Sequence, residues 1–170
     1  VNNLIPAWEN GKLKPIDKLE VHQRALRHKA ISVFIIAGNK TLIQRRALNK
    51  YHTPGLWANA CCTHPYWEEE PRNCAARRLN EELGVTTSLD FIYRNQIEYK
   101  ADVGNDLVEH ELVDIFTLET KDIKNIKIDI NVSIDLTLCE ILICLKKFFL
   151  GLLSSSVSTI KLVFFSKAIK

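Results

Sequence analysis

The chain has 170 residues, of which 46% are hydrophobic and 25% are charged, and its formal net charge is +3. This length and composition are typical of one globular domain that buries its own core, and they exclude a disordered or fibrous protein. The small, scattered positive charge excludes the dense basic surface of a nucleic-acid-binding protein; it is consistent with solubility and one small anionic ligand.

Location and redox state follow from three features. Residues 1–13 lack the apolar stretch and the cleavage site of a secretory signal, so we expect a cytoplasmic protein. The five cysteines are odd in number and Cys61 and Cys62 are adjacent, which disulfide geometry disfavours, so we expect reduced thiols. The apolar stretch 136–153 is interrupted by charged residues, and we expect it to belong to the core rather than to a membrane.

The first half of the chain predicts a hairpin, a strand and a helix. From Lys29 to Arg46, two β-branched apolar runs are joined by a Gly-Asn-Lys turn, which predicts a β-hairpin. Residues 55–61 supply a third strand. From Glu69 to Leu83 apolar residues recur at near-helical spacing, with Pro71 in the first turn and Gly84 after the last residue, which predicts one amphipathic helix.

The second half predicts more strands and another helix. Residues 91–99 and 107–117 form a hairpin closed by a Gly-Asn turn, and apolar residues alternate over 126–134 as in a strand. Apolar residues at helical spacing over 138–152 predict a helix. Together these elements predict an α/β (or α+β) fold: a mixed sheet flanked by helices in one domain over residues 1–170.

The predicted helix carries the first chemical motif. The segment Glu69-x7-Arg77-Arg78-Leu79-Asn80-Glu81-Glu82-Leu83-Gly84-Val85 resembles the Nudix box of enzymes that act on diphosphate-linked substrates. Glu82 can hold Mg²⁺ against a diphosphate there. Thr63 stands where a glycine is usual, and Arg78 replaces the first metal-binding glutamate, which argues against hydrolysis. On charge alone, the same helix could simply carry i,i+4 ion pairs on its surface.

A cysteine motif precedes this helix. The stretch Trp57-Ala58-Asn59-Ala60-Cys61-Cys62-Thr63-His64-Pro65 resembles the motif of type I isopentenyl-diphosphate isomerases of the Nudix superfamily. Other elements match that family as well: Pro54-Gly55, Arg45-Arg46-Ala47-Leu48 and the distance from His64 to Glu82. Because several short elements occur in one order over residues 10–117, the resemblance is specific. It implies a Nudix fold and the conversion of isopentenyl diphosphate to dimethylallyl diphosphate in isoprenoid biosynthesis.

The resemblance implies a set of metal ligands: His22, His28, His64, Glu109 and Glu111. Taken singly, His22 or His28 would more often be a surface or core histidine. Three imidazoles and two carboxylates are a ligand set that Mn²⁺ or Zn²⁺ accepts. Glu109 and Glu111 are two apart on a predicted strand, so both side chains point to the same side while that of His110 points away.

The resemblance also implies the catalytic groups. Moving the double bond requires one proton to be added and another to be removed through a carbocation-like state, which calls for two groups on opposite faces of the substrate. These are Cys62 and Glu111, with Tyr99 assisting protonation; metal coordination would hold Glu111 rigidly. A cysteine beside a cation-rich site can titrate near neutral pH, although a lone cysteine is more often an inert buried thiol.

The implied site also includes residues that bind the phosphate groups and an aromatic residue that packs against the isoprenyl group. Lys18, Arg46, Lys50 and Arg78 match the family's phosphate-binding residues, and such cations bind phosphate oxygens. The resemblance fades beyond about Thr117, where the family has a tryptophan against the reacting isoprenyl group. Here the last tryptophan is Trp67, and the candidates to replace it are Phe148, Phe149, Phe164 and Phe165.

Two other functions stay open at this point. One is a Nudix pyrophosphohydrolase acting on nucleoside diphosphate derivatives. The other is a non-catalytic module that binds a diphosphate or a metal, since the residues after about Thr117 are unmatched. The expected partner is a small isoprenyl diphosphate, with neither nucleic acid nor membrane, and the oligomeric state is not predicted.

Overall fold

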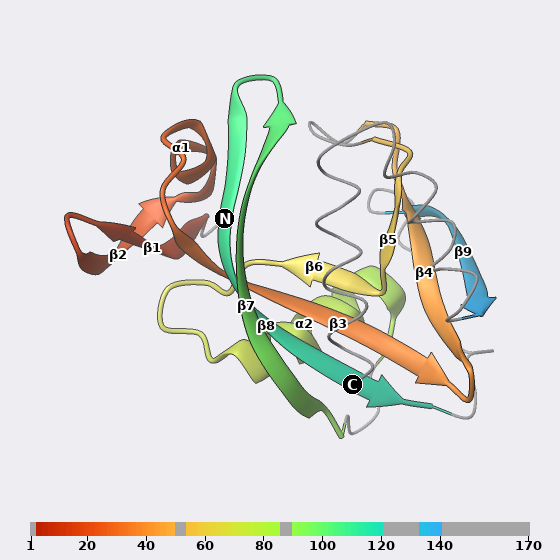
Figure 1. The fold of residues 1–170 in the computed structure, drawn as a ribbon. Helices are drawn as coiled ribbons and strands as arrows, with labels where there is room; N and C mark the ends of the chain where they lie inside the picture. Colours follow the sequence, from red (N-terminus) through yellow and green to blue (C-terminus); the bar gives the residue numbers. More distant parts are fainter. Residues whose placement is uncertain (1–2, 50–53, 86–89, 121–132, 141–170) are drawn as a thin grey trace.

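The computed structural model describes residues 3–49, 54–85, 90–120 and 133–140. In chain order, its elements are β1 (Leu4–Glu9), β2 (Lys12–Asp17), α1 (Lys18–Gln23), β3 (His28–Ala37), β4 (Lys40–Arg46), β5 (Trp57–Asn59), β6 (Cys61–Thr63), α2 (Pro71–Leu83), β7 (Ile92–Gly104), β8 (Leu107–Glu119) and β9 (Ser133–Glu140). The β1–β2 hairpin and α1 lie on one side of the molecule, and β4, β5 and β9 lie on the other (Figure 1).

Strand β3 organises the mixed sheet. It pairs antiparallel with β1, β4 and β6 and parallel with β8. Strand β7 pairs with β8, whereas β5 and β9 pair with β4. The β3–β8 register places His28 opposite Glu111, and the β7–β8 register places Tyr99 opposite the same glutamate. The predicted mixed sheet with helices is confirmed.

Helix α2 covers one face of the sheet. Pro71 stands in its first turn, and Gly84 ends it with a φ of 63°, the left-handed conformation that glycine adopts without steric cost. Leu79 and Leu83 are fully buried in a cluster that includes Ile31 of β3. Burying one leucine contributes about 1.5–3 kcal/mol, so this apolar face holds the helix to the sheet. The predicted helix is confirmed.

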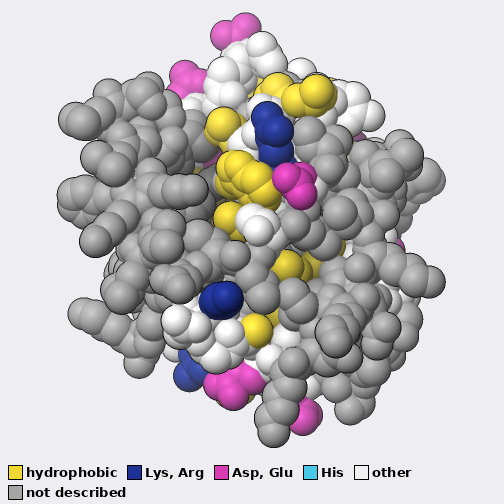
Figure 2. Space-filling view, turned by 90° about the vertical axis from the view of Figure 1, so that its right-hand side faces the viewer, with side chains coloured by type: hydrophobic (Ala, Val, Ile, Leu, Met, Phe, Trp, Pro, Cys, Tyr) yellow, Lys and Arg dark blue, Asp and Glu magenta, His cyan; other side chains and the backbone are white. Residues whose placement is uncertain are grey.

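The opposite face of the sheet carries a second apolar cluster. It consists of Ala30, Phe34, Ile43, Ile97, Val113 and Ile115, with Ile36, Trp57 and Tyr99 packed against it. Alternate side chains of a strand point to opposite faces, so Ala30 and Phe34 lie here while Ile31 and Val33 face α2. Seen from the side of β4, β5 and β9, hydrophobic side chains also reach the surface, between residues drawn in grey (Figure 2). Both faces of the sheet are therefore apolar.

Both predicted hairpins are confirmed, but the third strand is split in two. The hairpins are β3–β4 and β7–β8. The segment predicted as one strand over 55–61 contains β5 and leads into β6, with Ala60 alone between them. The split occurs because β5 pairs with β4 whereas β6 pairs with β3.

The helix predicted over 138–152 is wrong for residues 138–140, which belong to a strand. Residues 133–140 form β9, which pairs along the whole of β4, with Leu42 opposite Leu138. A short apolar run does not distinguish a strand from a helix, and the edge of β4 offers backbone hydrogen-bond partners that decide between them. Residues 141–152, and most of the strand predicted over 126–134, lie outside the described residues. In the part of the chain that the structure describes, no helix is long and apolar enough to cross a membrane.

The N-terminal hairpin and α1 are elements that the sequence analysis did not predict. The Asn-Gly pair at 10–11, with φ of 52° and 74°, is the turn signal that could have revealed the hairpin. Arg27, just after α1, stacks over the Trp8 ring at 4.2 Å and donates two hydrogen bonds to Glu98 of β7 at 2.9 and 3.0 Å. These contacts hold the N-terminal segment to the sheet, where α1 contacts β8, the strand of Glu111.

Candidate active site

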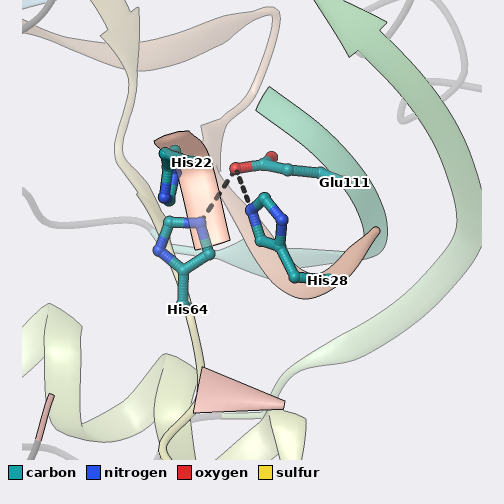
Figure 3. A group of neighbouring side chains, drawn as sticks. All are labelled: His22, His28, His64 and Glu111. Carbon is teal, nitrogen blue, oxygen red and sulfur yellow. Dashed lines mark hydrogen bonds and ion pairs between the residues drawn. The ribbon is translucent and has the colours of Figure 1, made fainter. Parts of the chain in front are cut away.

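Four side chains from separate elements converge beside β8. They are His22 of α1, His28 of β3, His64 just after β6 and Glu111 of β8 (Figure 3). One ligand atom from each lies within 4.8 Å of the others. The imidazole rings are 4.8 to 5.2 Å apart between centroids. These residues, called the His/Glu cluster below, point toward one another as ligands of a single ion would.

Local structure explains why these side chains meet. The parallel β3–β8 register puts His28 directly opposite Glu111. Strand β6 pairs with β3 through Thr63, which delivers the following His64 to the same place. Helix α1 begins at the Asp17 cap, whose carboxylate accepts hydrogen bonds from the backbone N–H of Leu19 (2.9 Å) and of Glu20 (3.3 Å).

The hydrogen bonds of two histidines assign their tautomers. Nδ1 of His22 lies 2.6 Å from the carbonyl oxygen of Lys18, and Nδ1 of His28 lies 2.8 Å from that of Leu26. A carbonyl oxygen only accepts, so each Nδ1 carries the hydrogen and each Nε2 presents a lone pair. Both Nε2 atoms are buried without a hydrogen-bond partner among the described residues.

A divalent metal fits this donor set. An unsatisfied buried polar group costs about 1–3 kcal/mol, and coordination of an ion would remove that cost for both Nε2 atoms. Nε2 of His64 lies 3.0 Å from Oε1 of Glu111, and Nε2 of His28 lies 3.7 Å from the same oxygen. A metal-binding histidine whose other ring nitrogen is held by a backbone carbonyl is the usual arrangement in metalloproteins.

Electrostatics keep the His/Glu cluster in its metal-binding protonation state. Burial lowers the pKa of His22 and lowers that of His64 further, so both imidazoles are neutral. Burial alone would raise the pKa of Glu111, but the hydrogen bond from His64 holds it well below its ordinary value. Neutral imidazoles and an ionised carboxylate are the forms that coordinate a metal.

Tyr99 connects the two predicted glutamates. Its hydroxyl lies 2.8 Å from Oε2 of Glu109 and 2.7 Å from Oε2 of Glu111. Burial, followed by the charge of Glu111, raises the pKa of Tyr99 well above its ordinary value, so the hydroxyl keeps its hydrogen. Glu109 does not belong to the His/Glu cluster of four, but it shares this tyrosine with the cluster.

Of the two adjacent cysteines, Cys62 is the one on the face of Tyr99. Cys61 is fully buried in the cluster beneath α2, and burial raises its pKa well above the ordinary value. Cys62 is exposed, lies opposite Ser32 of β3, and is close enough for its charge to raise the pKa of Tyr99. Among the described cysteines, Cys61 and Cys74 are free thiols.

Glu82 and Arg78 form a separate pair on α2. The Arg78 guanidinium donates to Glu82 and also to Glu81, at 2.7 Å in the second case. Glu82 is 3% exposed and also accepts a hydrogen bond from Gln44 Nε2 at 3.3 Å. The i,i+4 ion pairs that were the alternative explanation of this helix are therefore present, but only the pair between Arg77 and Glu81 lies at the surface, since Glu82 is buried. Arg78 Nε remains a buried donor without a partner among the described residues.

The other predicted phosphate-binding residues lie in different places. Lys18 is the first residue of α1, and after burial its charge is the next cause that lowers the pKa of His64. Arg46 is the last residue of β4, and its backbone bonds to residues 55 and 56. Lys50 lies outside the described residues, as do the four phenylalanines that were candidates to replace the family's tryptophan.

Sequence reasoning missed two amide side chains that contact the cysteine motif. Gln44 Nε2 donates to the carbonyl oxygen of Ala60, and Asn59 Nδ2 donates to that of Cys61. Asn59 lies inside the motif itself. Gln44 is a polar residue in the apolar run of β4 and is 5% exposed. A polar residue in a strand with two buried faces is the signal that could have revealed it.

Comparison with known proteins agrees with this geometry. A family profile described as "NUDIX domain" matches residues 26–131. An isopentenyl-diphosphate Delta-isomerase of Dinoroseobacter shibae is 64% identical over 119 residues, which cover 70% of this chain and 67% of the relative. The chain belongs to the isopentenyl-diphosphate Delta-isomerase family of the Nudix superfamily. A second isomerase of this family, from Rhodobacter capsulatus, is 60% identical over 116 residues, which cover 68% of this chain and 65% of the relative.

Solved structures confirm the Nudix fold of this isomerase family member. A Deinococcus radiodurans protein superposes with a TM-score of 0.69 at 15% identity, covering 87% of this chain and 89% of its own. A MutT protein of Methanosarcina mazei gives a TM-score of 0.59 at 16% identity, covering 84% and 93%. At such low identity these likenesses concern the fold alone.

Proposed function

We propose that this chain interconverts isopentenyl diphosphate and dimethylallyl diphosphate as one domain over residues 1–170, a step of isoprenoid biosynthesis. The observation that carries this proposal is the His/Glu cluster, whose Glu111 is bonded to Tyr99 on the sheet face that also bears Cys62. The names of the relatives supply the reaction, and the geometry supplies an acid–base pair for it.

The proposed metal ligands are the three histidines and Glu111, with Glu109 as a fifth. Mn²⁺ or Zn²⁺ suits this mixed nitrogen and oxygen set. The bound ion would orient the Glu111 carboxyl group and tune its acidity. The chain's own contribution is the fixed Nδ1–H tautomer of His22 and of His28, which directs both lone pairs to one point.

Glu111 and Cys62 are the proposed proton-transfer groups. On one face of the alkene, Glu111 acts through the Tyr99 hydroxyl bonded to it: the hydroxyl, which keeps its hydrogen, delivers that proton to the terminal carbon, which leaves a tertiary carbocation-like centre. On the other face, Cys62 accepts a proton from the neighbouring carbon, and the double bond forms there. The apolar cluster that contains Phe34 and Val113 offers a water-poor surface on the same side of the sheet.

The diphosphate is proposed to bind between α1, β4 and α2. Lys18, Arg46, Lys50 and Arg78 supply cationic donors for its oxygens. The buried Nε donor of Arg78, which has no partner among the described residues, supports this role. Glu82 is proposed to hold Mg²⁺ against the diphosphate. The pairing of Arg78 with Glu82 disfavours pyrophosphohydrolysis, because a cation stands where the hydrolases carry a further metal-binding glutamate.

The test is direct conversion. The protein is incubated with isopentenyl diphosphate, Mg²⁺ and Mn²⁺, and the ratio of the two isomers and the release of phosphate are followed. We expect isomerisation without phosphate release, and a loss of at least about 100-fold in Cys62→Ala, since acid–base groups contribute about 100- to 10,000-fold. The control is Cys74→Ala, which removes a thiol on the buried face of α2. No conversion by metal-loaded protein refutes the reaction, whereas full activity of Cys62→Ala refutes only the role of the cysteine.

A further inference from the structure

The chain bends at Ala60, two residues before the candidate catalytic cysteine, Cys62. Strand β5 pairs with β4 and β6 pairs with β3, so the backbone changes its partner strand across a single residue. Ala60 and Cys61 are both fully buried. Buried carbonyl oxygens at such a bend need hydrogen-bond donors.

Two amide side chains supply these donors. Gln44 Nε2 donates to the carbonyl oxygen of Ala60 at 3.0 Å, and Asn59 Nδ2 donates to that of Cys61 at 2.6 Å. Because a carbonyl oxygen only accepts, these contacts also assign the orientation of both amides. Gln44 and Asn59 are called the amide clamp below.

Each arm of the amide clamp also reaches a second element. Asn59 Nδ2 lies 2.9 Å from Oγ of Ser32 and 2.9 Å from the carbonyl oxygen of Val33, both on β3. Gln44 Nε2 lies 3.3 Å from Oε2 of Glu82 on α2. The bend is thus tied to the central strand on one side and to the Nudix helix on the other.

We propose that Gln44 and Asn59 are positioning residues that hold the Cys62 thiol at its reacting position across the substrate from Glu111. The inference rests on the proposed isomerase function. Strand β6 has three residues and, among the described strands, pairs with β3 alone, so its own ladder resists displacement weakly. The amide clamp holds the two carbonyl groups that precede Cys62, and a loss of either contact lets the thiol move relative to Tyr99 and Glu111.

The test compares Gln44→Ala and Asn59→Ala with Gln96→Ala. Gln96 is a matched control because its amide also donates to a side chain, Asp114, at an exposed site on β7. Steady-state assays give kcat and KM for isopentenyl diphosphate. Alkylation of Cys62 by iodoacetamide is followed against pH by tandem mass spectrometry, whose fragment ions distinguish Cys62 from the adjacent Cys61. A displacement of about 1 Å can cost about 100-fold in rate, so we expect kcat to fall about 10- to 100-fold with KM within about threefold.

The Cys62 alkylation profile separates positioning from simple stabilisation. In the clamp variants we expect it to shift along the pH axis, whereas in Gln96→Ala the profile and kcat stay unchanged. A lowered melting temperature with unchanged kcat and an unchanged alkylation profile overturns the proposal. If Asn59→Ala does not fold, unchanged kcat in Gln44→Ala overturns it equally. If the unmodified protein fails to isomerise, the proposed function fails, and the alkylation profiles still decide whether the amide clamp positions Cys62.

Discussion

At the residue scale, hydrogen bonds to the backbone decide what the histidines can do. His22 and His28 each give their Nδ1 hydrogen to a carbonyl oxygen of their own segment, and the Nε2 lone pairs are left buried beside Glu111. His110 differs, although it lies next to Glu111 in the chain. Its Nε2 lies 3.2 Å from Oε1 of Glu98, a half-exposed residue of the neighbouring strand β7.

His22→Ala should therefore lower the affinity for Mn²⁺ or Zn²⁺ far more than His110→Ala. The loss of a residue that only orients a ligand costs about 10- to 100-fold in metal affinity, and the loss of a ligand should exceed that. Titration calorimetry on metal-free protein measures both variants against the unmodified chain. Equal losses in the two variants, or none in either, would contradict the assignment of the His/Glu cluster as the metal site.

At the element scale, α1 depends on its cap because it has only six residues. The Asp17 carboxylate satisfies two backbone N–H groups at the start of this helix. Asp17→Ala should cost about 1 kcal/mol of unfolding free energy, since N-cap replacements by alanine cost about 0.5–2 kcal/mol. It should also weaken metal binding, because α1 carries His22. Urea unfolding and metal titration test the two effects, and a loss of stability with unchanged metal affinity would show that α1 keeps its place without the cap.

Local sequence patterns predict some of the elements and miss those whose conformation depends on distant strands. The two hairpins and α2 could be predicted because their turn residues, Pro71 and Gly84 are local signals. Strand β9 could not, since its conformation depends on the edge of β4, about ninety residues earlier in the chain. The split between β5 and β6 depends likewise on two partner strands. The N-terminal hairpin was missed, although its Asn-Gly turn is a local signal.

At the scale of the whole molecule, the site exists only in the folded chain. Its candidate metal ligands come from α1, β3, the end of β6 and β8, and no periodicity of the sequence relates these segments. The resemblance to a known family named the ligands, and the sheet register explains their meeting, since His28 lies opposite Glu111 and Glu111 lies opposite Tyr99. The amide clamp was not named in advance, because its contacts join strands whose pairing is not visible in the sequence.

The pH dependence of stability is a property of the whole chain that the His/Glu cluster should dominate when no metal is bound. In the unfolded chain an imidazole has a pKa near 6.5, and burial lowers the pKa of His22 and His64 in the folded state. Below about pH 6.5 the unfolded chain therefore binds more protons than the folded chain, and stability falls as the pH falls. The depressed pKa of Glu111 adds stability above its ordinary value of 4.5, and this part is lost as the pH falls through the folded pKa.

Melting temperatures with a chelator present should thus be nearly constant from pH 8 to 7 and should fall from pH 6 to 5. For a chain of this size, each kcal/mol corresponds to roughly 2–4 °C. Excess Mn²⁺ should raise the melting temperature, most strongly above pH 6.5, since the ion binds the neutral imidazoles of the folded state. His64→Asn should reduce the fall between pH 7 and 5, because one buried imidazole no longer resists protonation. Stability that rises in that interval would mean that the buried histidines are charged in the folded protein, and their Nε2 atoms would then carry a hydrogen in place of the lone pair.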